Sequence, residues 1–270
     1  MAKENEYAPD YSTDELLACF LARDFEDGME IATGVGMPVI RAAVYLAALS
    51  RCPNTRIRMA GTYTNILNVG PVGPFEFDYD IRAARWAEAY VPDEDDSSWE
   101  ARLMVRHGYF FVGALQIDKY GNGNLIGIGD DYKKLKLRGP GGIGAPTISS
   151  QQKHYYIQVN RHDRRTFVEK CDYISHIGWD KGGEDARKKL GMPGGGPKYV
   201  LTPLCIMDFE EHTKRMRLKY VHPGVTKEEV IENTGFELIV PEKVPTTPPP
   251  TKEEIALIRT KIDREGELRK

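Results

Sequence analysis

The chain has 270 residues, enough for one large domain or two small ones with a sizeable core. Its 37 Lys and Arg against 40 Asp and Glu give a formal net charge of -3, which argues against nucleic acid or an anionic membrane as the main partner. No apolar run approaches the roughly 20 residues that cross a bilayer, and the polar, acidic N-terminus is unlike a secretory signal.

Cysteine spacing predicts no metal centre. No pair of cysteines has the C-x-x-C spacing of a zinc or redox site. Scattered thiols without a secretory signal are typical of a reducing compartment, so we expect a cytoplasmic protein. The four residues are Cys19, Cys52, Cys171 and Cys205.

Two capping boxes mark helix starts near the ends of the chain. Ser12 with Glu15, and Thr251 with Glu254, have the Ser/Thr-x-x-Glu spacing in which each side chain caps the other's backbone N–H. Apolar residues follow each box at helical spacing. We therefore predict an early helix whose apolar stripe joins the core, and a final amphipathic helix.

Composition suggests three segments. Residues 1–11 are polar and are predicted to be a flexible N-terminus, and residues 12–240 are expected to form a single α/β domain. Residues 241–270 hold a Pro-rich strap and the C-terminal helix. Such a strap can dock on its own chain or on a partner subunit.

A glycine pair joins the first predicted strand to an Ala-rich helix. The strand lies around Ile31, Gly34-x-Gly36 follows, and the helix starts at Pro38. The pattern is similar to a dinucleotide-binding turn, but Val39 stands where the third glycine belongs and no acidic residue follows at a ribose-binding distance. We interpret it as an ordinary α/β turn with a helix N-terminus able to face a ligand.

The next predicted strand, residues 56–60, ends in the neutral sequence Gly-Thr-Tyr-Thr-Asn at 61–65. An acidic and aromatic segment follows, in which Glu76 is either a catalytic acid or, as we favour, a solvated loop carboxylate. Residues 81–109 are predicted to begin with a helix that carries Trp86.

The stretch 110–157 holds the clearest loop signals. An apolar run at 110–117 predicts a buried strand, and Asn-Gly near residue 122 predicts a turn. Residues 139–144 read GPGGIG, and four glycines in six residues favour a loop over a helix or strand. That loop is either a tight surface turn or a backbone cradle for an oxyanion or cofactor.

Further strands are predicted over residues 154–159, 167–174, 199–208 and 216–221, the third of them interrupted by Pro203. His176 is interpreted as a packed or solvent-facing residue, since no second ligand lies at zinc spacing. Strands and helices alternate and more strands follow, so we predict an α/β fold with an open, largely parallel sheet flanked by helices.

Several segments together resemble a known family. They are the Gly34-x-Gly36 turn, FVGALQIDKYGNGN at 111–124, GPGGIG at 139–144 and VHPGVTKEEVIENTGFEL at 221–238. Their order resembles the β subunit of the family I coenzyme A transferases, most closely the glutaconate CoA-transferase branch. The resemblance covers nearly the whole chain from Ser12.

The resemblance implies an acyl-CoA substrate and a partner. Members are heteromers of two related α/β subunits with the active site at their interface, which implies an α subunit in a heterodimer or α2β2 assembly. Coenzyme A would enter as part of the substrate, and no permanently bound cofactor is implied. The implied CoA-binding residues are Gly34, Gly36, Arg138, Gly139, Gly141, Gly142 and Gly144. Lys133, Lys134 and Arg138 either meet the CoA phosphates or form a solvated basic loop.

One position departs from the family pattern. Transferases of this family carry a Glu after a β-subunit strand, where it attacks the acyl-CoA and becomes a glutamyl-CoA thioester. Residues 61–65 contain no carboxylate, and Thr or Asn cannot form the acyl anhydride that precedes this thioester. The chain is therefore similar to the two-subunit hydrolases that open the last ring in bacterial steroid breakdown, whose catalytic Glu comes from the α subunit.

Three hypotheses follow, with no certain catalytic residue on this chain. The first is a ring-opening hydrolase subunit in which Thr62, Tyr63 and Asn65 line the pocket. The second is a true CoA-transferase whose nucleophile is Glu76 or an α-subunit residue. The third is a scaffolding subunit that only completes its partner's site.

Overall fold

The computed structural model describes residues 6–33, 36–59, 63–66, 87–90, 108–142 and 144–270. The chain divides into two compact units. The first comprises residues 1–100, 107–109 and 248–270, and the second residues 101–106 and 110–247. The predicted boundaries at residues 12 and 240 remain predictions.

The first unit combines a small sheet with two packed helices. The strands are β1 (Glu30–Thr33), β2 (Arg56–Met59), β3 (Tyr63–Ile66), β4 (Ala87–Tyr90) and the start of β5 (Gly108–Val112). They hydrogen-bond in the order β5-β1-β2-β3-β4, with β1 parallel to both β5 and β2. β3 and β4 join antiparallel at the edge.

Helices α1 (Thr13–Asp24) and α2 (Pro38–Ser50) form the core of this unit. Both capping boxes are confirmed. The Ser12 hydroxyl accepts from the Glu15 N–H at 3.0 Å while Glu15 accepts from the Ser12 N–H at 2.9 Å, and Thr251 caps α8 (Lys252–Leu257) in the same way. α2 is hydrophobic nearly all round and is buried from Val39 to Ala47.

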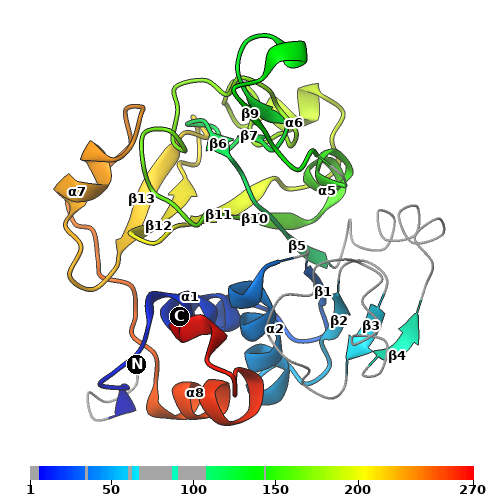
Figure 1. The fold of residues 1–270 in the computed structure, drawn as a ribbon, viewed down its shortest axis with the longest axis vertical. Coiled ribbons are helices and arrows are strands. Elements are labelled where there is room, and N and C mark those ends of the chain that lie inside the picture. The colour runs from blue at the N-terminus through cyan, green and yellow to red at the C-terminus, as the bar shows by residue number, and fades with distance from the viewer. Residues whose placement is uncertain (1–5, 34–35, 60–62, 67–86, 91–107, 143) are drawn as a thin grey trace. The chain divides into compact units, whose positions relative to one another are not determined.

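The C-terminal segment returns to the first unit. After α8 come η3 (Ile258–Ile262) and η4 (Glu267–Arg269). Arg259 pairs with the fully buried Glu15 at 2.8 Å, and Arg23 holds Glu254 as well as the carbonyl oxygens of Pro248 and Pro249. The strap therefore docks on its own chain, one of the two predicted possibilities, as Figure 1 shows in orange and red.

The second unit is built on β10 (His154–Gln158), β11 (Pro197–Leu201), β12 (Cys205–Phe209) and β13 (Met216–Val221). They hydrogen-bond in that order, β10 parallel to β11 and the other pairs antiparallel. Both units thus combine parallel strands with an antiparallel edge, and the predicted α/β fold with an open sheet and flanking helices is confirmed.

Smaller elements surround this sheet. They include two short hairpins, β6 (Gln116–Ile117) with β7 (Gly123–Asn124) and β8 (Gly127–Ile128) with β9 (Leu137–Arg138). The short helices are η2 (Tyr132–Lys134), α5 (Ala145–Gln151), α6 (Ala186–Lys189) and α7 (Lys227–Glu232). The chain leaves β5 at Val112 and passes directly into these hairpins, which carry the glycine-rich motif.

Some predicted elements were wrong. Most of the helix expected from residue 81, with Trp86, lies outside the described residues, but Ala87–Tyr90 form strand β4, because pairing with β3 overrides the helical preference of the alanines. The run 110–117 is not one strand: β5 ends at Val112 and β6 begins at Gln116. Pro203 lies in the tight turn that separates β11 from β12, and residues 167–174 form no strand.

Candidate functional site

The turn between β1 and α2 exposes a helix N-terminus. Met37 is the N-cap of α2 and makes no side-chain cap, and no acidic residue lies in the first turn. Gly36 adopts a φ of 68°, which favours glycine, and open space lies where its Cβ would be. The first N–H groups of a helix have no intrahelical partner, so this end of α2 is suited to face an anion. Gly34 lies outside the described residues.

The neutral stretch predicted to replace the family's Glu is partly described. Tyr63 and Asn65 belong to β3, where Tyr63 is aligned with Met59 of β2. The neutral sequence that follows the predicted strand is therefore itself a strand from Tyr63 onward. Thr62 and Glu76, the other pocket candidates, lie outside the described residues.

The glycine loop 139–144 packs against Leu125 and Ile126. Gly139 donates to the Ile126 carbonyl at 2.9 Å, and a Cβ on Gly139 would lie 2.2 Å from the Leu125 carbonyl oxygen. Gly141, with a φ of 93°, donates its N–H to the same Leu125 oxygen at 2.9 Å. Glycine is required at both positions, in the first by close approach and in the second by backbone conformation.

Two amides of this loop stay available among the described residues. The N–H groups of Gly142 and Gly144 have no hydrogen-bond partner there, whereas the carbonyl of Gly142 accepts from Ala145 at 2.8 Å. Gly144 is also the N-cap of α5. Of the loop glycines predicted to bind coenzyme A, Gly139 and Gly141 thus already donate to backbone carbonyls, whereas Gly142 and Gly144 can meet a ligand oxygen.

A buried amide side chain fixes the segment beneath the loop. Asn124 is fully buried and donates to Gln116 and to the Gly127 carbonyl, both at 2.7 Å. Its side-chain oxygen accepts from the Ile126 N–H at 2.8 Å. Because Leu125 and Ile126 supply the carbonyls that hold the glycine loop, Asn124 sets the loop's position.

Ser175 supports the same segment from another part of the chain. Its hydroxyl accepts from the Leu125 N–H at 2.9 Å and donates to the Gly123 carbonyl at 3.1 Å. A Cβ on Gly142 would lie 3.5 Å from the Ser175 Cβ. Sequence reasoning missed Asn124 and Ser175, and the only available signal was the Asn-Gly turn around residue 122.

Arg187 fixes the far end of α5. Its buried guanidinium donates to the carbonyls of Gly194 and Gly178, each at 2.9 Å, and to Ser149 and Ser150 at the end of α5. Burial lowers the pKa of Arg187 from its ordinary value. Carbonyl oxygens replace the water that this buried cation has lost.

His176 is a packed residue, one of the two interpretations offered by the sequence. It is fully buried, and neither ring nitrogen has a hydrogen-bond partner among the described residues. Burial lowers its pKa to about 4, so the ring is neutral at pH 7. A Cβ on Gly123 would lie 2.1 Å from this ring. No group of three His, Cys, Asp or Glu suited to a metal ion occurs in the described part of the chain.

The basic segment before the glycine loop is exposed. Arg138 ends β9, and its guanidinium lies 5.0 Å from the centre of the Tyr132 ring. Lys133 and Lys134 belong to η2, and Lys136 follows. All of these cations are solvent-exposed.

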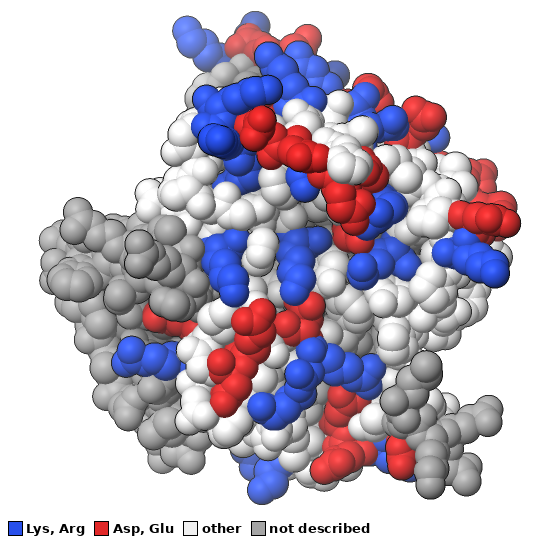
Figure 2. Space-filling model, turned by 180° about the vertical axis from the view of Figure 1, so that it is seen from behind, with Lys and Arg blue, Asp and Glu red and all other residues white. Residues whose placement is uncertain are grey.

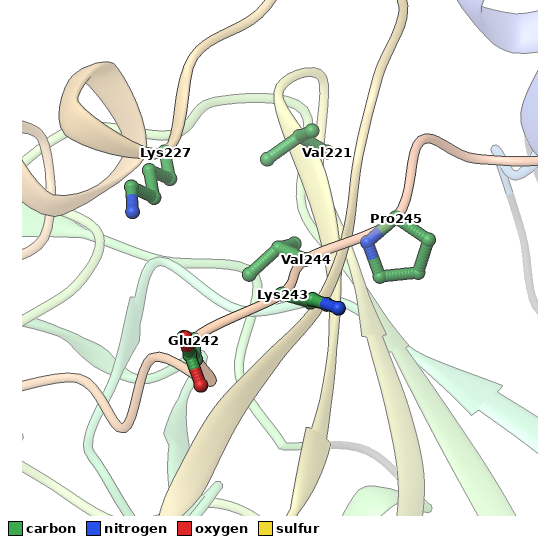
Figure 3. A pocket seen from close by; sticks show the side chains of 6 residues that line it. All are labelled: Val221, Lys227, Glu242, Lys243, Val244 and Pro245. Carbon is green, nitrogen blue, oxygen red and sulfur yellow. The ribbon is translucent and has the colours of Figure 1, made fainter.

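A surface hollow elsewhere in the second unit lacks catalytic features. It measures about 640 Å³ and lies between the end of β13, the start of α7 and residues 242–245. Its floor is apolar, and Figure 3 shows the ends of Lys227 and Lys243 on different sides of the hollow. The two ammonium groups therefore do not converge on a common ligand.

Surface charge is mixed on the face shown in Figure 2, where Lys and Arg alternate with Asp and Glu over the described residues. Within those residues, no helix is both long and apolar enough to span a membrane. The features that could bind a ligand are thus the N-terminus of α2 and the glycine loop with its basic segment.

Comparison with known proteins agrees with these features. The family model described as "Coenzyme A transferase" matches residues 15–233. The chain belongs to the coenzyme A transferase family. It is 37% identical to the B subunit of 3-oxoadipate CoA-transferase from Pseudomonas knackmussii over 92% of both chains. It is 33% identical to the B subunit of glutaconate CoA-transferase from Acidaminococcus fermentans over 94% of this chain and 93% of that one.

A second kind of relative is the cholesterol ring-cleaving hydrolase IpdB subunit of Mycobacterium tuberculosis. It is 32% identical over 64% of this chain and 66% of its own length. Among solved structures, glutaconate coenzyme A-transferase from A. fermentans superposes with a TM-score of 0.86 at 30% identity, covering 98% of this chain and 99% of that one. The predicted family and fold are therefore confirmed, and the relatives are B subunits of two-subunit enzymes.

Proposed function

We propose that this family member is the β subunit of a heteromeric enzyme that hydrolyses a cyclic β-oxo acyl-CoA with cleavage of a carbon–carbon bond, as in steroid catabolism. The observation that carries the proposal is the sequence at 61–65, Gly-Thr-Tyr-Thr-Asn, which has no carboxylate at the position implied for the transferase nucleophile. The likeness to the ring-cleaving hydrolase subunit supports it.

The proposed reaction needs a base and a place for negative charge. A Glu of the α subunit takes a proton from water, and the hydroxide oxygen bonds to the ring ketone carbon. The bond from that carbon to the α-carbon of the thioester then breaks, which leaves a carboxylic acid and a thioester enolate. The enolate takes up a proton at its α-carbon, so atoms and charge balance.

This chain would contribute neutral donors. The N–H groups of Gly142 and Gly144, which have no hydrogen-bond partner among the described residues, are suited to an enolate oxygen, because preorganised amides stabilise developing negative charge without reorganising. Thr62, Tyr63 and Asn65 would line the acyl pocket. Gly36 at the N-terminus of α2 and Arg138 beside the glycine loop are the proposed contacts for coenzyme A.

A second candidate is a CoA-transferase that moves coenzyme A between an acyl-CoA and a carboxylic acid. The two transferase subunits named above favour it, since they match over a larger share of the chain than the hydrolase does. In that case the nucleophile would be Glu76 or a residue of the α subunit.

Isotope labelling separates the two candidates. The assembled two-subunit enzyme is incubated with a cyclic β-oxo acyl-CoA in ¹⁸O-water, with no added carboxylic acid. Hydrolysis predicts a ring-opened product that keeps its thioester and carries one ¹⁸O in the new carboxylate. Turnover that requires an added carboxylic acid and leaves the ring closed would establish the transferase instead.

A further inference from the structure

Arg187 on α6 is a buried cation without a counter-ion. The residue is 3% exposed, and no carboxylate pairs with it in the part of the chain that the structure describes. Burying a cation is unfavourable unless polar atoms replace the water that it loses. A charge kept in the interior under these conditions indicates a role that a smaller or neutral side chain could not fill.

Every N–H donor of this guanidinium bonds a main-chain carbonyl. Arginine has five such donors in a fixed plane, more than any other side chain offers. The acceptors are the carbonyls of Ser149, Ser150, Ile177, Gly178 and Gly194. Three segments that are separate in the sequence are thus joined at one point, and Figure 1 shows α6 beside α5 there.

Helix α5 connects this point to the glycine loop. Gly144 is its N-cap, and the Gly144 carbonyl accepts from the Ile148 N–H at 2.9 Å. The Gly142 carbonyl accepts from the Ala145 N–H at 2.8 Å. Both glycines whose amides are proposed to meet the enolate are therefore bonded to the first turn of α5. A helix of 7 residues is short and stiff, so holding its far end also holds these glycines.

Ser149 provides a second link between α5 and its support. It is 1% exposed, and its hydroxyl donates to the Pro146 carbonyl at 3.1 Å and accepts from the Ile177 N–H at 3.2 Å. The segment that carries Ile177 also carries Ser175, whose Cβ would lie 3.5 Å from a Cβ on Gly142. The same segment therefore supports both ends of the path from Arg187 to the glycine amides.

We infer that Arg187 is a positioning residue for the proposed reaction and acts through α5 to place the amides of Gly142 and Gly144 at the enolate oxygen. This role rests on the proposed function and adds to it a residue that touches no substrate. All bonds of the guanidinium go to carbonyls, so it leaves both amides to the ligand. A misplacement of about 1 Å can slow an enzyme on the order of a hundredfold, so the support of these donors affects the rate.

Arg187→Lys in the assembled two-subunit enzyme is the first test. Lysine keeps the positive charge, but its three donors on a flexible stem cannot bond all the segments that the guanidinium joins. Arg217→Lys is the matched control, because it makes the same exchange at an arginine of β13 that bonds Asp208.

A milder pair of variants tests the same link if Arg187→Lys fails to fold. Ser149→Ala keeps α5 and removes only the hydroxyl that bonds Ile177. Ser50→Ala is its control, because the Ser50 hydroxyl bonds the Leu46 carbonyl at the end of helix α2. Circular dichroism establishes that each variant is folded.

Two rates are measured with defined probes. The first is ring opening of a small cyclic β-oxo acyl-CoA, the coenzyme A thioester of β-oxo-cyclohexanecarboxylic acid, to pimeloyl-CoA. The second is exchange of the α-proton of pimeloyl-CoA in deuterium oxide, followed by mass spectrometry. In this exchange the base removes the α-proton, the thioester enolate forms, and a deuteron returns to the same carbon. Amide hydrogen exchange over residues 142–151 reports separately how firmly α5 is held.

We expect Arg187→Lys to lower kcat and the rate of α-proton exchange at least about tenfold while KM stays within about twofold. Amide exchange over residues 142–151 should become faster. Ser149→Ala should lower both rates severalfold, and both controls should match the wild type. Unchanged rates in folded variants, a change confined to KM, or an equal fall in Arg217→Lys would overturn the role of Arg187.

Failure of this role and failure of the proposed function give different results. A wild type that neither opens the ring nor exchanges the α-proton refutes the proposed function, whatever the variants do to α5. A wild type that does both, with Arg187→Lys and Ser149→Ala equally fast, keeps the reaction and refutes the positioning role.

Discussion

The two units of this molecule hold one segment each by different interactions, ion pairs in the first unit and neutral hydrogen bonds in the second. In the first unit the C-terminal segment is tied by charge, through Arg259 to Glu15 and Arg23 to Glu254. In the second unit the glycine loop is held by neutral groups, chiefly Asn124 and Ser175. Partly exposed ion pairs are weakened by salt, whereas hydrogen bonds between neutral groups do not depend on net charge.

The difference suits the roles that we propose. A carboxylate that accepted from the N–H groups of Gly142 and Gly144 would compete with an enolate for them, and support by neutral side chains avoids that conflict. The C-terminal strap has no proposed role in stabilising negative charge, so ion pairs can hold it. Substitutions that remove a neutral support should therefore lower the free energy of unfolding by more than substitutions that break an ion pair.

Asn124→Ala should be the most damaging change. It leaves the part-buried N–H of Ile126 and the buried carbonyl of Gly127 without their partner, so the free energy of unfolding should fall by about 3 kcal/mol. Urea denaturation measures it. Asn54→Ala removes an exposed amide that bonds Asp27 and should cost under about 1 kcal/mol. Equal losses in the two variants would contradict the role given to Asn124.

Gly139→Ala should come next. The new methyl group would lie 2.2 Å from the Leu125 carbonyl oxygen, so the backbone must move, at a cost of roughly 2 to 3 kcal/mol. Gly144→Ala is the matched control, because its Cβ would lie 3.4 Å from Ile148 at an ordinary helical φ. Melting temperatures that fall alike in both variants would show that the close approach at Gly139 is not a constraint.

Acid should weaken the second unit through its buried histidines. Burial lowers the pKa of His162 and His176 to about 4, while the unfolded chain takes up protons near pH 6.5. Stability is thus unaffected above pH 6.5 and falls as the pH drops from there toward 4, by up to about 1.4 kcal/mol per pH unit for each histidine. Urea titrations of His176→Leu should show a shallower slope than the wild type, and an identical slope would contradict the assignment.

The ion pair that holds the strap should matter least. Arg23 and Glu254 are partly exposed, so Glu254→Gln should lower the free energy of unfolding by about 1 kcal/mol at low salt and by less in 1 M salt. Lys227→Ala, at a cation 4.0 Å from Glu228, should have no measurable effect and serves as the control. A loss that salt leaves unchanged would mean that packing, not charge, secures the strap.

The structural features that depend on residues close together in the sequence could be predicted. The capping boxes at Ser12 and Thr251 and the loop at 139–144 follow from spacing within a few positions, and all were confirmed. The features that depend on contacts between residues far apart in the sequence were missed. Ser175 bonds Leu125, which is fifty residues away, and β4 forms because it pairs with β3 rather than because of its own composition.

The candidate site shows the same limit. The glycines at 139–144 could be singled out, but that Gly141 is engaged, while Gly142 and Gly144 meet no partner in the described part of the chain, depends on where Leu125 lies. The pocket candidates at 62–65 followed from a family comparison and remain predictions.

Trapping of a covalent intermediate tests the central claim most directly. The assembled enzyme is incubated with acyl-CoA, treated with borohydride and digested, and peptides of this chain are examined by mass spectrometry for a glutamyl-CoA thioester or its reduced product. The account predicts no modified carboxylate on this chain, at Glu76 or elsewhere. A modified Glu on this chain would contradict it and establish a transferase nucleophile here.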